Sequence, residues 1–177
     1  MKKNTINLIF FSAALLIGLS ACKSVNNATI ITGLAYERQP LAHAQIALRD
    51  STGKQFNTET NALGIYSISI RGVTPPLLVS VVSQGKTEDC SNNSRLRPIC
   101  LAAIVTRTST DSNFVANINP LTDRVVSDIA VSKGFIGPQQ WVDSNTIGTI
   151  DTHIANQSLT AMRNGFSTAL TLAGITN

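Results

Sequence analysis

Short apolar segments with a period of two residues run from residue 29 to about residue 119, and this pattern constrains the fold more than any other feature. Gly, Pro, Asn and Asp separate the segments, and alternation of this kind indicates strands that bury one face. Seven segments occur, at residues 30–36, 44–49, 55–59, 66–70, 77–82, 101–106 and 114–118. Seven short strands at this spacing predict a mainly β chain with a Greek-key β-sandwich.

The alternation also predicts which side chains enter the core. The expected buried faces are Ile30, Leu34 and Tyr36 in the first strand, Ala44, Ile46 and Leu48 in the second, and Tyr66, Ile68 and Ile70 in the fourth. Asp50 to Gly53 has the composition of a turn, so the second strand and an edge strand around Phe56 should form a hairpin. Residues 77–82 are rich in β-branched side chains, which favours a central strand.

The period changes after Asn119, where two or three α-helices are expected. Asn119 can cap a helix over residues 120–133, because Pro120 suits its first turn and Gly134 follows its last. Pro138 should open a second helical segment, and residues 144–173 have the spacing of a third. Ser158 interrupts the apolar stripe of the third helix, so we expect this tail to gain its stability by docking on the sandwich or a partner. Trp141 and Phe166 are the expected contacts.

The amino terminus has the layout of an export signal. Lys2 and Lys3 precede an apolar run at residues 8–17 and the small-residue sequence Leu19-Ser20-Ala21-Cys22. The run is about half the ~20 residues of a membrane-spanning helix, so a transmembrane anchor is the weaker alternative.

Leu19 to Cys22 closely resembles the lipobox of bacterial lipoprotein precursors; the alternative is an ordinary secretory signal with a chance cysteine. The resemblance implies cleavage before Cys22, a lipid on its thiol, and a membrane as the partner of that lipid. Lys23 stands where an aspartate would favour inner-membrane retention, which implies the outer membrane of a Gram-negative cell, in either leaflet.

These features divide the chain into a signal peptide at residues 1–21, a lipidated tether at 22–28, a sandwich at 29–119 and a helical tail at 120–177. The full chain carries 14 Lys and Arg and 10 Asp and Glu, a net charge of +4. Lys2 and Lys3 leave with the signal, so the mature charge is about +2. Clustered cations are absent, and we therefore expect no nucleic-acid partner.

Three cysteines occur in the chain, and the lipid would consume one of them. Because an exported protein enters an oxidising compartment, Cys90 and Cys100 are expected to form a disulfide that closes a short polar loop.

The strand region resembles the carboxypeptidase regulatory-like family. The residues that carry the resemblance are Gly33, the run Gln39-Pro40-Leu41-Ala42-His43-Ala44, the turn at Asp50 to Gly53, and Thr60-Asn61-Ala62-Leu63-Gly64-Ile65-Tyr66. It implies a transthyretin-like or immunoglobulin-like sandwich, sometimes called carbohydrate-binding-like, that serves as an accessory module. Asn61 stands where the family usually has Asp, and His43 where it often has Gly, which puts the loop geometry in doubt.

Residues suited to catalysis are sparse, so we expect no enzyme activity, no cofactor and no metal. His43 and His153 lie far apart without a motif, and Asp151 and His153 would diverge on a helix. Asp123 and Asp128 near Arg124 are interpreted as the solvated side of a helix, and Glu88 and Asp89 as a solvated loop. Trp141 could stack on a sugar, although a packing role is the better interpretation.

Two hypotheses for function remain. In the first, the loops of a lipid-anchored sandwich bind a protein or a glycan as an accessory module. In the second, a structural envelope component docks to a membrane partner through its helical tail. Exposed aromatic side chains on the loops would favour the first, and an uncovered apolar stripe on the last helix would favour the second.

Overall fold

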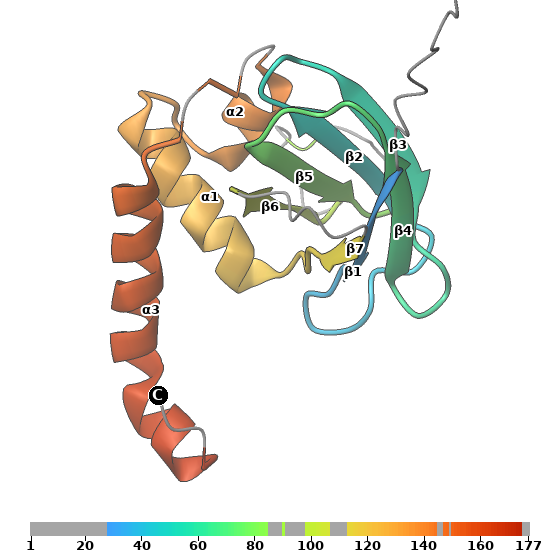
Figure 1. The fold of residues 1–177 in the computed structure, drawn as a ribbon. Coiled ribbons are helices and arrows are strands. Elements are labelled where there is room, and N and C mark those ends of the chain that lie inside the picture. Colours follow the sequence, from blue (N-terminus) through green and yellow to red (C-terminus); the bar gives the residue numbers. More distant parts are fainter. Residues whose placement is uncertain are drawn as a thin grey trace, which may run out of the picture.

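The computed structural model describes residues 28–84, 90, 98–106, 113–144, 147–148 and 150–174. Seven strands form two sheets, with the orders β4-β1-β7 and β3-β2-β5-β6 (Figure 1). The strands are β1 (Thr29–Leu34), β2 (Gln45–Asp50), β3 (Gln55–Glu59), β4 (Ile65–Ile70), β5 (Leu77–Val82), β6 (Cys100–Val105) and β7 (Asn113–Val115). Neighbouring strands are antiparallel except β1 and β7, which are parallel. The two-sheet sandwich is confirmed, and its Greek-key connection stays a prediction.

The buried face of β1 was predicted wrongly. Ile31 and Ala35 are fully buried, whereas Ile30, Leu34 and Tyr36 are each about two-fifths exposed. Successive strand side chains point to opposite faces, so an error of one residue inverts the whole assignment. The expected faces of β2 and β4 are confirmed, since Ile46, Leu48, Tyr66 and Ile70 are all buried.

The inner face of β1 carries small residues because another side chain fills the space. A Cβ atom on Gly33 would lie 2.6 Å from Cε1 of Tyr66 and 2.0 Å from the carbonyl oxygen of Ala116. The hydroxyl of Tyr66 donates a hydrogen bond to that carbonyl. Burial raises the pKa of the Tyr66 phenol. The largest fully buried side chain of the sandwich therefore occupies the place that the glycine leaves open.

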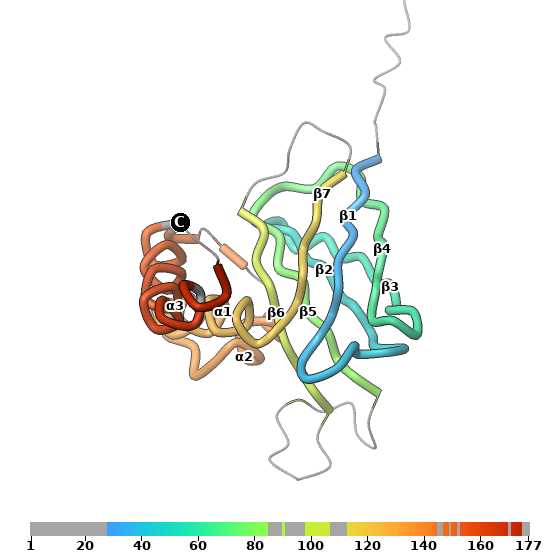
Figure 2. The backbone as a smooth tube through the Cα atoms, turned by 90° about the horizontal axis from the view of Figure 1, so that it is seen from below, coloured from blue at the N-terminus to red at the C-terminus, as the bar shows by residue number. Residues whose placement is uncertain are grey.

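Strand β5 is covered on both faces, which explains its continuous apolar sequence. It pairs with β2 and β6 in the middle of the larger sheet, as predicted. Leu77, Val79 and Val81 belong to the core between the two sheets, whereas Leu78 faces the helices. The molecule thus has three layers, with the helices on the outer face of the larger sheet (Figure 2).

Three helices follow the strands: α1 (Pro120–Ser132), α2 (Pro138–Asp143) and α3 (Thr152–Leu172). The predicted cap of α1 is confirmed, because Asn119 accepts hydrogen bonds from the backbone N–H groups of Leu121 and Thr122. The third helix begins eight residues later than expected. Ser144 is extended and Gly148 has a φ of +63°, so regular helix starts only after Asp151 caps it. None of the described helices is long and apolar enough to span a membrane.

Trp141 anchors the helical layer, as predicted. It is fully buried in a cluster with Leu78 and Ala102 of the sheet and Val126 and Ile129 of α1. A solvent-exposed stacking platform for a sugar is therefore excluded at this residue.

The short helix α2 is held to the sheet at its carboxyl end. The guanidinium of Arg49 in β2 donates a 2.8 Å hydrogen bond to the carbonyl of Val142 and a second one to the carbonyl of Ser144. A cation at this position also interacts favourably with the negative end of the helix dipole.

Candidate functional site

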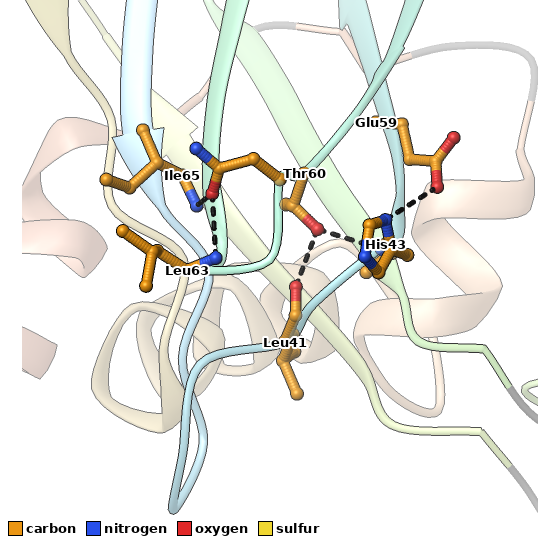
Figure 3. A network of polar contacts seen from close by, with 8 residues as sticks. Leu41, His43, Glu59, Thr60, Leu63 and Ile65 are labelled. Atoms are coloured by element: carbon orange, nitrogen blue, oxygen red, sulfur yellow. Dashed lines mark hydrogen bonds and ion pairs between the residues drawn. The ribbon is translucent and has the colours of Figure 1, made fainter.

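One end of the sandwich is formed by the loops at residues 35–44 and 60–64. The turn between β3 and β4 is held by Thr60, which is buried (Figure 3). Its hydroxyl donates to the carbonyl of Leu41 at 2.6 Å and accepts from the N–H of Ala44 at 2.8 Å. Both loops are thus joined by one buried side chain, and this end of the sandwich has a fixed shape.

Asn61 and His43, the two residues that differ from the expected pattern, both take part in the structure of this loop end. Asn61 accepts hydrogen bonds from the N–H groups of Leu63 and Ile65, as an aspartate would (Figure 3). His43 has a φ of +52°, the left-handed region that glycine adopts without strain. The imidazole of His43 is mostly exposed and lies 3.8 Å from the carboxylate of Glu59.

The loop end offers few side chains for recognition. Tyr36, which was expected in the core, is 40% exposed, but its hydroxyl donates to the carbonyl of Arg38 beside it. Leu63 at the tip of the turn is 64% exposed. A single half-exposed tyrosine does not make an aromatic platform for a ring-shaped ligand.

A hollow lies beside the disulfide. Cys90 and Cys100 are joined as predicted, with their Cα atoms 5.9 Å apart. A cavity of about 560 Å³ adjoins them and includes Glu37 and Asp123 in its lining.

Asp123 is not on the solvated side of α1, in contrast to the sequence interpretation. Its carboxylate accepts a 2.8 Å hydrogen bond from the N–H of Ala102 in β6. Burial raises the pKa of Asp123 to about 6, against the opposing effect of that hydrogen bond.

A hollow that is strongly apolar at one end runs between α1 and α3 in the described part of the chain, and we call it the α1–α3 groove. Two adjoining cavities of about 510 and 460 Å³ share Thr122, Val125 and Leu159, so they form one continuous groove. Its apolar lining at the free end consists of Leu121, Val125, Leu159, Met162, Phe166 and Ala169. Leu121, Leu159 and Phe166 are each about half exposed.

Only the first half of α3 packs against the body of the molecule. Ser158, which was expected to dilute the apolar stripe, is buried and donates a 2.5 Å hydrogen bond to Asp128 of α1. Asp128 also pairs with Arg124 at 3.0 Å, so it is only partly solvated. From Arg163 onward every described side chain of α3 is exposed, so Phe166 is not buried against the sandwich, and its contact with a partner stays a prediction.

The sequence carries a signal for the apolar face of this groove. Leu159, Met162, Phe166 and Ala169 recur at three and four residues, the spacing of one helix face. The pattern predicts a helix, and the structure confirms it as part of α3. The pattern alone does not show whether the second half of this helix face packs against another element. That depends on where α1 ends relative to α3.

The remaining expected sites are dispersed. His153 is exposed on α3, and the carboxylate of Asp151 accepts from its backbone N–H as a helix cap. Among the described residues, no three His, Cys, Asp or Glu side chains are grouped as metal ligands. Cys22, Glu88 and Asp89 lie outside the described residues.

Comparisons with known proteins identify no family. No family model and no curated protein matches the chain. Among solved structures, the major plantain pollen allergen Pla l 1 aligns over 52% of this chain and 89% of its own, with 15% identity and a TM-score of 0.35. A 9R-lipoxygenase from Cyanothece PCC8801 aligns over 54% of this chain and 17% of its own, with 16% identity and a TM-score of 0.33.

A C-terminal fragment of the pilus adhesin SpaC from Lactobacillus rhamnosus GG aligns over 53% of this chain and 45% of its own, with 10% identity and a TM-score of 0.30. Similarity at this level assigns neither a family nor a function. The resemblance to the carboxypeptidase regulatory-like family stays a prediction.

Proposed function

We propose that this chain is a non-enzymatic lipoprotein of the bacterial envelope that docks a protein partner through the α1–α3 groove. The observation that carries the proposal is the exposed apolar face of α3 along the groove, on which Leu159 and Phe166 are half exposed. Monomeric proteins rarely leave a continuous apolar strip of this kind in water. A groove between two helices is suited to a third amphipathic helix.

The position of the groove supports this function. Residue Thr29 begins β1 at one end of the sandwich, and the loops at residues 35–44 lie at the other. The carboxyl half of α3 projects beyond the strands and loops of the sandwich, where a partner helix can reach the groove (Figure 1).

The alternative function uses the loops of the sandwich to bind a protein or a glycan. Leu63 and Tyr36 are the exposed side chains that favour it. Its weakness is that the loop end combines one exposed leucine with one half-exposed tyrosine, whereas the groove presents a continuous apolar strip.

The two functions are separated by paired substitutions in the full chain. Phe166→Asp places a charge in the groove, and Leu63→Asp places the same charge on the loop tip. Membrane fractions are then treated with a short photoactivated cross-linker that does not react through lysine. The masses of the cross-linked products are compared between the two variants. The proposal requires that Phe166→Asp removes the cross-linked complex and that Leu63→Asp preserves it; the reverse pattern would assign function to the loops.

The anchor is tested separately with Cys22→Ser. The unmodified chain should partition into the detergent phase with the mass of a diacylated protein, and Cys22→Ser should partition into water. If Cys22→Ser still partitions into the detergent phase and still has the mass of a lipidated chain, lipidation at Cys22 is refuted.

A further inference from the structure

We propose that the free edge of strand β7 binds an extended segment of a partner protein, which adds a further strand to the smaller sheet. β7 is the outer strand in the order β4-β1-β7, and β1 is its neighbour in that sheet. The residues that line the α1–α3 groove come from the end of β6, from α1 and from α3. The edge of β7 is therefore a second surface, and the inference goes beyond the proposed function.

The backbone of β7 carries hydrogen-bonding groups that no described residue satisfies. The N–H groups of Ala116 and Ile118 donate to the carbonyls of Thr32 and Leu34 in β1, at 2.8 and 2.9 Å. Alternate residues of a strand turn their backbone groups to opposite sides, so those of Val115 point away from β1. Among the described residues, the N–H and C=O groups of Val115 have no hydrogen-bond partner. An extended backbone can pair with them in the manner of strand addition.

Other strand edges of the molecule are covered, and this contrast distinguishes β7. On β6, two side chains of α1 hydrogen-bond to both backbone groups of Ala102. On β4, Asn61 donates its backbone N–H to the carbonyl of Ile65, and its side chain accepts the N–H of Ile65. Covered or charged edges prevent pairing with other chains. Residues 113–117 carry no charged side chain, and nothing in the described part covers their outward backbone groups in this way, so this edge remains able to pair.

The neighbouring side chains define the chemistry of the added strand. Val115 is 68% exposed on the outer face of the smaller sheet. Phe114 and Val105 pack against the core between the sheets but are only partly buried. Figure 2 shows that β6 lies beyond β7, so the larger sheet continues past the last strand of the smaller one. The added strand would cover the partly buried side chains. We therefore expect it to alternate apolar residues facing inward with uncharged polar residues facing outward.

The edge is short, so the pairing should be weak. Residues 113–117 extend for ~16 Å at the rise of a strand. The same alternation turns the backbone groups of Asn113 and Asn117 outward with those of Val115. A single short strand pair is marginal in water. We therefore expect a free peptide to bind at millimolar concentration, and a segment of a protein that is held nearby to bind more tightly.

The test uses the full mature chain from residue 22, made soluble by Cys22→Ser and labelled with nitrogen-15. The probe is a synthetic peptide with blocked ends, Lys-Thr-Val-Thr-Val-Thr-Lys. The control is the same peptide with every internal backbone nitrogen methylated, which removes its N–H donors. Nuclear magnetic resonance measures amide hydrogen exchange. The probe should slow exchange at Val115 and Asn117 about tenfold at a concentration about ten times its Kd, and the control should not.

Matched variants locate the pairing. Val115→Pro removes the outward N–H without breaking a hydrogen bond to β1, and proline is tolerated at such edge positions. Ser67→Pro is the control, because residue 67 has the equivalent outward position on β4. Slowed exchange at Asn117 should be lost in Val115→Pro and kept in Ser67→Pro. It should also be kept in Phe166→Asp, which changes only the groove.

Each remaining outcome contradicts the inference. Equal slowing by both peptides would show binding through side chains and would overturn strand addition. Equal slowing at Ser67 and Ser69 of β4 would show that the peptide does not select β7. No slowing by millimolar probe, in protein that has its disulfide and its normal circular dichroism, would overturn the inference without affecting the proposed function of the groove.

Discussion

The carboxylate of Asp123 in α1 accepts the backbone N–H of Ala102 in β6 at 2.8 Å, while Thr122 donates its hydroxyl to the carbonyl of Ala102 at 3.0 Å. Strand β6 is the outer strand of the larger sheet, and an outer strand exposes unpaired backbone groups. Two consecutive side chains of the helix thus satisfy both backbone groups of one edge residue. The helical layer is attached to the sheet by polar contacts as well as by the apolar cluster around Trp141.

This relationship predicts a pH dependence of stability. The folded pKa of Asp123 is about 6, above the ~3.9 of an unfolded aspartate, so the folded chain binds more protons between these values. The free energy of unfolding should therefore fall as the pH rises from about 4 to about 6. Because the carboxylate is partly solvated, we expect a change on the order of 1 kcal/mol.

Urea denaturation of the wild type and Asp123→Asn across this pH range measures the effect. The asparagine can still accept from Ala102 but cannot titrate. A difference between the two proteins that does not change with pH would contradict the raised pKa.

Asp50 should have the opposite dependence. Burial of its carboxylate opposes ionisation, but hydrogen bonds from Thr52, Thr74 and Lys54 outweigh it and lower the pKa of Asp50. The stabilisation is therefore present above pH ~4 and is lost as the pH falls through the lowered folded value. In Asp50→Asn the loss of stability in acid should be smaller than in the wild type, as measured by thermal melting at pH 2 to 5.

Thr60→Val should destabilise the sandwich by about 2–3 kcal/mol, because it leaves the buried N–H of Ala44 and carbonyl of Leu41 without their partner. Thr58→Val is the control in the adjacent strand β3, since Thr58 makes one 3.2 Å hydrogen bond to the carbonyl of Ser67 at a more exposed position. Chemical denaturation should separate the two variants clearly. Equal effects would mean that Thr60 does not join the loops.

Two glycine substitutions should act in opposite directions. Gly33→Ala introduces a Cβ atom that overlaps the carbonyl of Ala116 and the ring of Tyr66, so a loss of about 3 kcal/mol or more is expected. At Gly165 in α3 a Cβ atom meets nothing within 4 Å, and Gly165→Ala should be neutral or stabilise by up to about 1 kcal/mol. The midpoints of thermal unfolding provide the comparison, and a tolerated Gly33→Ala would refute the close approach.

Aromatic truncation distinguishes packing from docking. Trp141→Ala should cost about 3–5 kcal/mol because the indole is fully buried. Phe166→Ala should cost less than about 1 kcal/mol in the isolated chain, since half of the ring is already in water. Denaturation of both variants at low protein concentration tests this; a large cost for Phe166→Ala would show that the ring packs within its own chain.

Much of the architecture is determined locally by the sequence. The alternation of apolar residues located all seven strands, and Asn119 with Pro120 marked the start of α1, because strand and helix periods differ and caps satisfy specific backbone groups. The pairing of Cys90 with Cys100, predicted from the sequence, is confirmed.

The tertiary structure decided what local periodicity leaves open. The side of β1 that is buried depends on the space that Tyr66 needs beside Gly33, and a strand with apolar residues on both faces does not reveal it. The environments of Asp123 and Ser158 depend on which groups of β6 and α1 lie opposite them. The uncovered half of α3 likewise exists because α3 extends beyond α1, a relation between two elements that is not encoded in the pattern of either helix alone.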